Sequence, residues 1–243
     1  MSEAEASQRY AVVTGANKGI GLEAVKQLAF NGITVILTAR DAKRGLEAVE
    51  KLKEFELSGR VLFHQLDVTD PASVASLADF ITTQFGKLDI LVNNAAISGL
   101  ILDPEELARA VEHAGGWNIP NELAKQILND VEKLTEERVD EVLSEFMKDF
   151  KEGRLEAKGW PTNVSAYKLS KASMNAYTRI LAKRFPNFRV NSIHPGYVKT
   201  DMTCNTGLLT VEEGAQILVT AALLPPDDKS SGLFISHEGV LSF

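Results

Sequence analysis

The stretch T-G-A-N-K-G-I-G at residues 14–21 decides the fold of this chain. An apolar run precedes it and a segment of helical periodicity follows it, which places a glycine-rich turn between a strand and a helix. In such a turn Gly15 permits the tight bend, Gly19 lets the backbone approach a pyrophosphate, and Gly21 lets the helix pack closely. The spacing G-x-x-x-G-x-G differs from the commoner G-x-G-x-x-G, and taken alone it is equally compatible with a plain tight turn.

Around this turn, short apolar runs alternate with segments of helical periodicity, a pattern typical of βαβ units and a parallel sheet. We expect strands at 10–14, 34–39, 61–66, 88–92, 190–193 and 233–236, the last of these being the final strand of the sheet, and helices at 20–31, 44–55 and 71–85. The sequence therefore predicts an α/β fold in one domain, residues 1–243, with a doubly wound, Rossmann-type parallel sheet.

Length and composition agree with one such domain. A chain of 243 residues with 44% hydrophobic content can bury about 70–75% of its unfolded surface. Its net charge of −7 gives no basic field for a nucleic acid, so we expect a small-molecule partner. The single Cys204 excludes an internal disulfide, and neither a secretory signal nor an apolar run long enough for a membrane span is present. These features predict a cytoplasmic protein without a metal.

The choice of nucleotide depends on the residue that follows the strand 34–39. Arg40 stands where a carboxylate would select NAD, and Lys18 lies inside the glycine run. Two cations can clamp a 2′-phosphate, so we predict NADP(H) as the cofactor. Two alternatives stay open: both cations are solvated surface charges, or Asp41, one residue late for the ribose, admits NAD.

Five motifs stand in this order: the glycine run, Asp67-Val68, N-N-A-A at residues 93–96, Tyr167-x-x-x-Lys171, and Pro195-Gly196 followed by Thr200. Together they resemble the short-chain dehydrogenase/reductase family over nearly the whole chain, although Y-x-x-x-K alone is a weak signal. The resemblance and the glycine run imply that the cofactor is bound by Gly15, Asn17, Lys18, Gly19, Ile20, Gly21, Arg40, Asp67, Val68, Asn93, Tyr167, Lys171, Pro195, Gly196, Val198 and Thr200.

The motifs N-K-G-I-G, T-A-R-D and V-K-T-D-M are most similar to those of the carbonyl reductase-like subgroup, which includes plant menthone and salutaridine reductases. That subgroup carries a helical insertion before the catalytic tyrosine, and residues 117–158 match it. Apolar residues fall at helical spacing over two segments of this stretch, at 123, 127, 131 and 134 and at 139, 142, 146 and 150. Because the insertion covers the helix face that other members use to pair subunits, the resemblance implies a monomer.

The resemblance also implies an enzyme that transfers a hydride between NADPH and the carbonyl of a small, cyclic or terpenoid-like ketone or aldehyde. Tyr167 would protonate the carbonyl oxygen as negative charge develops on it. A free phenol has a pKa near 10, and lowering it to about 7 takes about 4 kcal/mol in favour of the phenolate. Lys171, one helical turn away, can supply that positive charge. We interpret His194, beside the Pro-Gly turn, as structural.

One part of the family's active site has no counterpart. Relatives carry an Asn on the helix after the fourth strand and a Ser at the end of the next strand. Here 72 residues separate Asn94 from Tyr167 (167 − 94 − 1), and the insertion takes most of them. Ser98, Ser144 and Ser165 all lack the strand-end setting, and Asn118 and Asn121 open the insertion.

The strand expected to carry that Ser lies in the middle of the family's sheet, where each unpaired backbone group costs about 1–3 kcal/mol. Two ways of closing the sheet stay open, a replacement strand at 98–102 or direct pairing of the fourth strand with 189–193. A short helix at 103–116 joins the insertion abruptly, so we interpret the junction as a deletion or an alternative transcript. The alternative function is a non-catalytic or truncated member that binds NADP(H) weakly or not at all.

Overall fold

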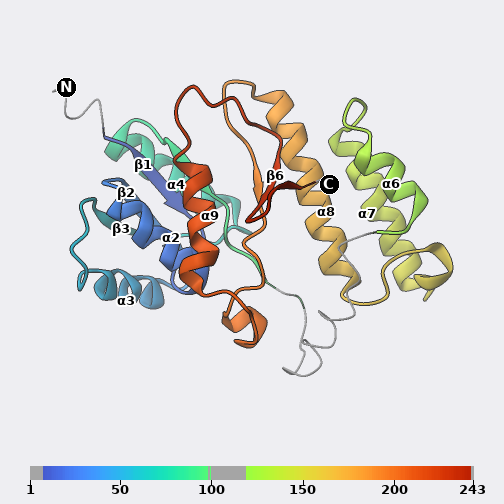
Figure 1. The fold of residues 1–243 in the computed structure, drawn as a ribbon, viewed down its shortest axis with the longest axis horizontal. Helices are drawn as coiled ribbons and strands as arrows, with labels where there is room; N and C mark the ends of the chain where they lie inside the picture. Colours follow the sequence, from blue (N-terminus) through green and yellow to red (C-terminus); the bar gives the residue numbers. More distant parts are fainter. Residues whose placement is uncertain (1–7, 98, 100–118, 242–243) are drawn as a thin grey trace. The chain divides into compact units, whose positions relative to one another are not determined.

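The structure is a computed structural model, and it describes residues 8–97, 99 and 119–241. The chain forms two compact units (Figure 1). The first comprises Met1–Ile97 and Tyr197–Leu224, and the second comprises Ser98–Gly196 and Pro225–Phe243. Within the described ranges no helix has both the length and the apolar character needed to cross a membrane.

The first unit is built on a parallel four-stranded sheet with the order β3-β2-β1-β4. Its strands are β1 (Tyr10–Val13), β2 (Thr34–Ala39), β3 (Val61–Gln65) and β4 (Ile90–Val92). The register places Val12 of β1 beside Ile36 on one side and Leu91 on the other. This arrangement confirms the predicted α/β fold with a parallel central sheet.

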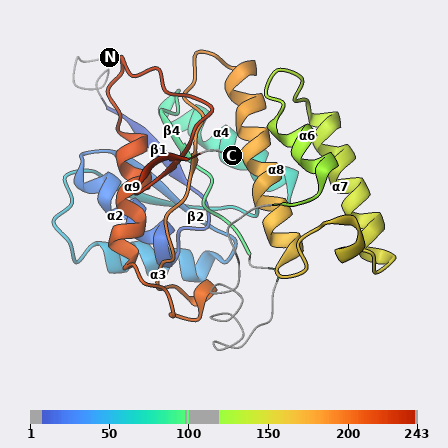
Figure 2. The ribbon, with the colours of Figure 1, turned by 45° about the vertical axis from the view of Figure 1, so that its right-hand side comes forward.

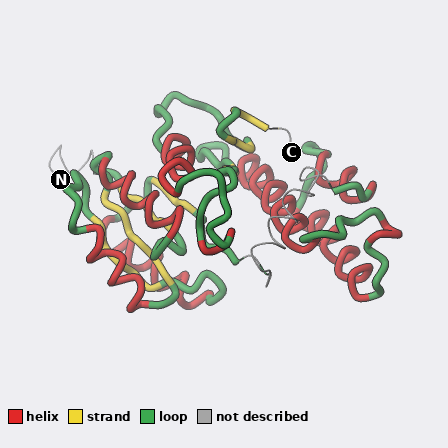
Figure 3. The backbone as a smooth tube through the Cα atoms, turned by 60° about the horizontal axis from the view of Figure 1, so that its bottom comes forward, coloured by secondary structure: helices red, strands yellow, loops and turns green. Residues whose placement is uncertain are grey.

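Helices cover both faces of this sheet: α2 (Gly19–Phe30), α3 (Ala42–Leu52), α4 (Pro71–Phe85) and α9 (Val211–Ala222). Alternate strand residues face opposite layers, so Val13 packs with α2, α3 and α9, whereas Val12 packs with α4. All six residues of β2 are buried, as expected for an inner strand covered on both sides. Figure 2 shows α2 and α9 side by side, and Figure 3 shows the strands running between the helices.

The second unit contains three packed helices (Figures 1 and 2). They are α6 (Glu122–Asn129), α7 (Glu136–Lys151) and α8 (Ser165–Arg184). Buried apolar residues from all three form one core, including Ile127, Val142 and Leu169. Two helices thus lie where the periodicity of the insertion predicts them, although residues 123, 131 and 150 are exposed and residues 131 and 134 follow the end of α6.

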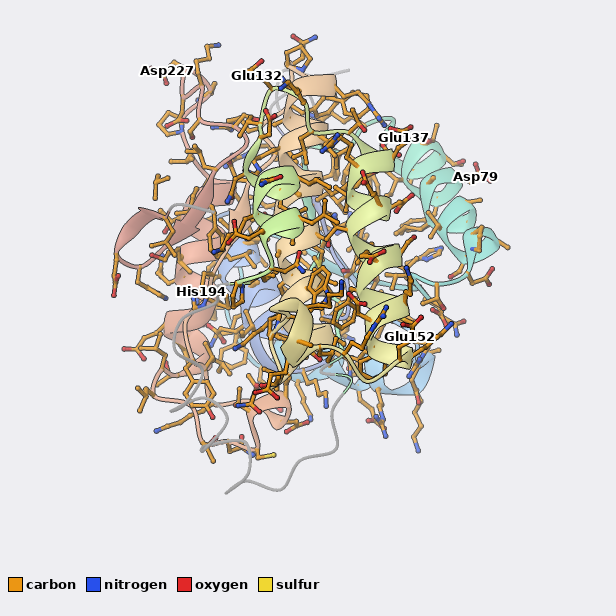
Figure 4. All side chains as sticks on the ribbon, turned by 90° about the vertical axis from the view of Figure 1, so that its right-hand side faces the viewer. Asp79, Glu132, Glu137, Glu152, His194 and Asp227 are labelled. Carbon is orange, nitrogen blue, oxygen red and sulfur yellow. The ribbon has the colours of Figure 1, made fainter. Side chains whose placement is uncertain are left out.

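Polar contacts hold the insertion helices together. The Asp149 carboxylate, 1% exposed, accepts hydrogen bonds from Trp160 Nε1 at 2.9 Å and from Arg154 at 3.1 Å. Figure 4 labels Glu132 in the turn between α6 and α7, and Glu152 at the other end of α7. Glu132 lies 3.4 Å from Lys183 of α8. The turn is therefore linked to α8 by charge as well as by packing.

A second, three-stranded sheet corrects one prediction. It consists of β5 (Ser192–Ile193), β6 (Phe234–Ser236) and β7 (Gly239–Leu241), in the order β5-β6-β7. The prediction that 233–236 is the final strand was wrong, because β7 follows it and pairs antiparallel with β6. Gly239 has φ +115°, which permits the chain reversal after a two-residue loop.

Among the described strands, β4 stands last in the order of the first sheet, and β5 pairs with β6 in the second sheet. Pairing of the fourth strand with 189–193 would join the two units, and it stays a prediction. Leu91, in the middle of β4, is 55% exposed. The replacement strand at 98–102, apart from Gly99, and the helix at 103–116 lie outside the described residues, as does the Gly116–Trp117 junction.

Candidate cofactor and catalytic site

The glycine run forms the turn between β1 and α2. Gly15 and Gly19 have φ values of +61° and +58°, in the left-handed region that glycine tolerates best. A Cβ added at Gly15 would lie 2.8 Å from the Cα of Ala95, and one added at Gly21 would lie 2.4 Å from the Nδ2 of Asn94. The close approach of the Ala95 backbone therefore requires glycine at position 15, and the close approach of the Asn94 side chain favours glycine at position 21.

Hydrogen bonds from the segment that follows β4 hold this turn in place. Asn94 Nδ2 donates to the carbonyl oxygens of Thr14 at 2.9 Å and Gly15 at 3.1 Å. The Ala95 N–H donates to Thr14 Oγ1 at 2.9 Å. We predicted Asn93 as the contact residue of N-N-A-A, yet Asn93 is exposed and the sequence reasoning missed Asn94. The strand alternation was the available signal, because Asn94 stands two residues after the buried Val92.

The first turn of α2 fits a phosphate group. Lys18 is the N-cap with an extended backbone and gives no side-chain cap, and no acidic residue stands in the first turn. Backbone N–H groups at a helix start carry partial positive charge and bind anions. Near the position of a Gly19 Cβ the closest atom is Thr200 Cγ2, at 3.6 Å. Asn17 and Ile20, which flank the two residues, are half-buried.

The end of β2 bears on the choice of nucleotide. Arg40 is exposed there, and its carbonyl oxygen accepts from Gln65 Nε2 at 2.9 Å. Asp41 is the N-cap of α3, and its side chain accepts from the Arg44 N–H at 3.0 Å. The Asp41 carboxylate is thus engaged in capping α3.

The residues after β3 lie at the same end of the parallel strands as Arg40, the carboxyl-terminal end. Asp67 is half-buried, and Val68 is 50% exposed. The Thr69 hydroxyl and then the Thr69 N–H donate to the Asp67 carboxylate, which lowers the pKa of Asp67, and the charge of Arg40 adds to this effect. Asp67 thus stays ionised and is fixed by its own turn.

The segment after β5 contributes to the first unit through a closed loop. Val198 is 2% exposed and forms a bridge with Leu209. Thr200 is the N-cap of the short 3-10 helix η2 (Asp201–Thr203). From η2 the carboxylate of Asp201 reaches Lys18 Nζ at 2.5 Å. This ion pair joins the glycine run to a segment 183 residues further along the chain.

The Tyr-Lys pair lies in the first two turns of α8, in the second unit. Lys171 Nζ is 5.5 Å from the ring centroid of Tyr167. Burial raises the pKa of Tyr167 and lowers that of Lys171, because both charged forms lose solvation. The direction for Tyr167 is opposite to the lowering that we expected Lys171 to produce. The ammonium group sits over the ring face and is itself half-buried, which explains why desolvation dominates.

Pro195 and Gly196 follow β5 in a turn fixed by two histidines. The Gly196 N–H donates to His194 Nδ1 at 3.1 Å, and His237 Nε2 donates to the Pro195 carbonyl oxygen at 3.2 Å. Burial lowers the pKa of His194, which favours the neutral ring that can accept this bond. Figure 4 labels His194 beside this turn. The contacts agree with the structural interpretation of His194.

Ser144, Ser165 and Asn121 lie on helices or at the start of one, and not at the end of a strand. Ser144 is exposed on α7, and Ser165 is buried in the first turn of α8. Asn121 caps α6 by accepting from the Ala124 N–H at 2.9 Å. Ser98 and Asn118 lie outside the described residues. Between Asn94 and Tyr167, the described part of the chain therefore places no Ser at the end of a strand.

The parallel sheet, the glycine turn at its edge and the helices on both faces define a Rossmann-like α/β protein. Two family models match the sequence, "short chain dehydrogenase" over residues 9–116 and "Enoyl-(Acyl carrier protein) reductase" over residues 155–222. The chain is 48% identical to (+)-neomenthol dehydrogenase of Arabidopsis thaliana, over 99% of this chain and 100% of the relative. It therefore belongs to the short-chain dehydrogenase/reductase family.

Solved structures agree with this membership. Salutaridine reductase from Papaver somniferum superposes with a TM-score of 0.85 at 42% identity, covering 93% of this chain and 99% of that one. Menthone neomenthol reductase from Mentha piperita gives a TM-score of 0.79 at 39% identity, covering 95% and 99%. These relatives match the carbonyl reductase-like subgroup that the motifs N-K-G-I-G and V-K-T-D-M indicated.

The length of the alignment with the Arabidopsis relative shows a difference between that protein and this chain. The alignment with the Arabidopsis protein has 295 positions and includes 100% of that relative, whereas this chain has 243 residues. At least 52 positions of the relative, the difference between 295 and 243, thus have no residue opposite them here.

Proposed function

We propose that this protein transfers a hydride between NADPH and the carbonyl carbon of a small ketone or aldehyde. The observation that carries the proposal is the pair of Tyr167 and Lys171 on α8, with the ammonium 5.5 Å from the phenol ring centroid. Family membership supports it, because the relatives are named as dehydrogenases and reductases of neomenthol, isopiperitenone and salutaridine. A cyclic, terpenoid-like substrate is the class that these names favour.

The first unit supplies the residues that would hold the cofactor. The uncapped first turn of α2 offers its N–H groups to the pyrophosphate, and Lys18 and Arg40 would bind the 2′-phosphate. Two further observations favour NADPH over NADH: Asp41 is engaged as a helix cap, and a mouse relative at 38% identity is named "Carbonyl reductase [NADPH] 3". When bound, NADPH supplies the hydride.

Tyr167 would then deliver a proton to the carbonyl oxygen. Because burial raises its pKa, the phenol keeps its proton over the physiological range, as a general acid requires at the start of a reduction. The same shift makes it a weaker acid, so positive charge near the hydroxyl is needed as the proton leaves. Lys171 is the cation one turn away on the same helix, and we assign it that role together with binding the ribose hydroxyls.

We propose that the missing positions include the helix and strand that carry the family's Asn and Ser. The support is the difference of at least 52 positions and the place of β4 as the last of the described strands in the first sheet. Losing one orienting donor typically lowers the rate about 10²–10³-fold without abolishing it. Slow turnover is therefore the expected behaviour, and binding of NADP(H) without turnover is the alternative.

Two assays on the purified full chain test the proposal. NADPH fluorescence follows binding, and absorbance at 340 nm follows NADPH oxidation in the presence of cyclic monoterpenoid ketones. Tyr167→Phe should bind NADPH but lose turnover, whereas Tyr177→Phe, an exposed tyrosine on the same helix, should retain both. Turnover that survives Tyr167→Phe would refute the assigned acid, and binding without any turnover in the wild type would favour the alternative.

We also propose a cytoplasmic monomer. The support for the monomer is the packing of α6 and α7 against α8 in one buried core, which removes that face of α8 from contact with a second copy. Size-exclusion chromatography with light scattering should give a mass near 26.5 kDa. A mass of twice that value at micromolar concentration would contradict it.

A further inference from the structure

Lys18, one of the two cations that we assign to the cofactor's 2′-phosphate, forms an ion pair with Asp201. The two charged atoms are 2.5 Å apart, and the side chains are 61% and 69% exposed. A phosphate that approaches Lys18 therefore meets a cation already in contact with a carboxylate.

Asp201 is held in this position by a well-bonded turn. Thr203 Oγ1 accepts from the Thr200 N–H at 3.0 Å and donates to the Val198 carbonyl oxygen at 2.6 Å. Val198 is buried, which anchors the turn to the first unit. The Thr200 methyl group also lies 3.6 Å from the Cβ position of Gly19, so η2 stands directly against the glycine run. The backbone that carries Asp201 is thus fixed beside the glycine run.

We propose that Asp201 is a specificity-determining residue that competes with the 2′-phosphate for Lys18 and so limits the preference for NADPH over NADH. The inference rests on the proposed function. A 2′-phosphate carries close to two negative charges, which Lys18 and Arg40 can balance only if Asp201 gives up its contact. NADH has no 2′-phosphate, so it binds without disturbing the pair.

The test is a fluorescence titration of the full chain with NADPH and with NADH. Exposed ion pairs have modest strength, so Asp201→Asn should tighten NADPH binding about twofold to fivefold and leave NADH binding unchanged. Glu50→Gln is the matched control. It removes an exposed ion pair with Lys53 of similar length, 2.6 Å, from the remote end of α3, and it should change neither affinity.

A double-mutant cycle separates competition from a structural role. In a Lys18→Met background, Asp201→Asn should lose most of its effect on the NADPH-to-NADH affinity ratio, because the shared cation is gone. The effect should also shrink in 1 M salt, where charges are screened within about 3 Å. A variant that weakens both coenzymes equally, or an unchanged ratio, would overturn the inference while the reductase proposal stands. A wild-type chain that binds neither coenzyme would overturn both.

Discussion

Gly15→Ala is the substitution that most sharply probes how β4 is held against the glycine run. The added methyl group would lie 2.8 Å from the Cα of Ala95 and 3.0 Å from its Cβ. Backbone cannot rotate away as a flexible side chain can, so the end of β4 must move. The residue would also keep φ near +61°, which costs a residue with a Cβ about 1–2 kcal/mol.

Three hydrogen bonds decide the size of the effect. They run from Asn94 Nδ2 to the Thr14 and Gly15 oxygens and from the Ala95 N–H to Thr14 Oγ1. Each contributes about 0.5–1.5 kcal/mol, so losing two or three adds about 1–4 kcal/mol to the backbone strain. The free energy of unfolding should therefore fall by about 2–6 kcal/mol, a large share of the ~5–15 kcal/mol of an ordinary domain.

Urea unfolding followed by far-UV circular dichroism measures this loss. Gly32→Ala is the control, because Gly32 is exposed, has φ +76° and has open space at its Cβ position. It should show only the backbone strain, about 1–2 kcal/mol. If Gly15→Ala costs no more than Gly32→Ala, then the contact between the turn and the end of β4 is not what holds this edge of the sheet.

Three further predictions concern other parts of the chain. Asn121→Ala removes the N-cap of α6 and a 2.7 Å bond to the Lys158 oxygen, so the free energy of unfolding in urea should fall by about 1–3 kcal/mol. The hydrogen bond from the Trp160 N–H lowers the pKa of Asp149 in the folded protein. As the pH falls below about 4, the carboxyl of the unfolded chain takes up its proton first, so the free energy of unfolding should fall there. Asp149→Asn should remove this part of the dependence of stability on pH. Arg40→Ala should weaken NADPH binding but not NADH binding in a fluorescence titration, and an equal loss for both would contradict its phosphate role.

Elements with strong local signals were predictable from the sequence. The strand 34–39 and the helix 71–85 have the predicted bounds. The helix begins after Asp70, which caps it, carries Pro71 in its first turn, and ends at Gly86 with φ +72°. These are the residues that local backbone geometry requires at helix ends, so no tertiary information is needed to place them.

Features that depend on distant contacts could not be predicted. The ion pair between Lys18 and Asp201 joins residues 183 positions apart. Opposite charge alone does not single out this pair, because the sequence contains many other lysines and aspartates. Strand β7 has three residues, too few for a period-two pattern to emerge. The pairing of β5 with β6 follows from tertiary context, because strands of two and three residues carry almost no register information.

Within the candidate site, the positions of the motif residues could be predicted from the sequence, whereas the properties of their side chains could not. The glycine turn and the Tyr-Lys pair lie where the motifs predict a turn and a helix, because the spacing of these residues fixes their local geometry. The pKa of Tyr167 was not predictable, since it depends on burial within the folded unit. Because burial raises the pKa of Tyr167, more positive charge must stabilise the phenolate as the proton leaves, and Lys171 is the residue to which we assign this role.

Carbonyl reduction by this chain can be followed as transfer of deuterium from NADPH labelled at C4 of the nicotinamide. The wild-type chain is incubated with a cyclic monoterpenoid ketone and each of the two C4 diastereomers, and the alcohol is analysed by mass spectrometry. A product one mass unit heavier with one diastereomer only, formed by the wild type and by Tyr177→Phe but not by Tyr167→Phe, is the result we predict. Unlabelled alcohol with both diastereomers, or no alcohol despite measurable NADPH binding, would contradict the assignment of this chain as a carbonyl reductase.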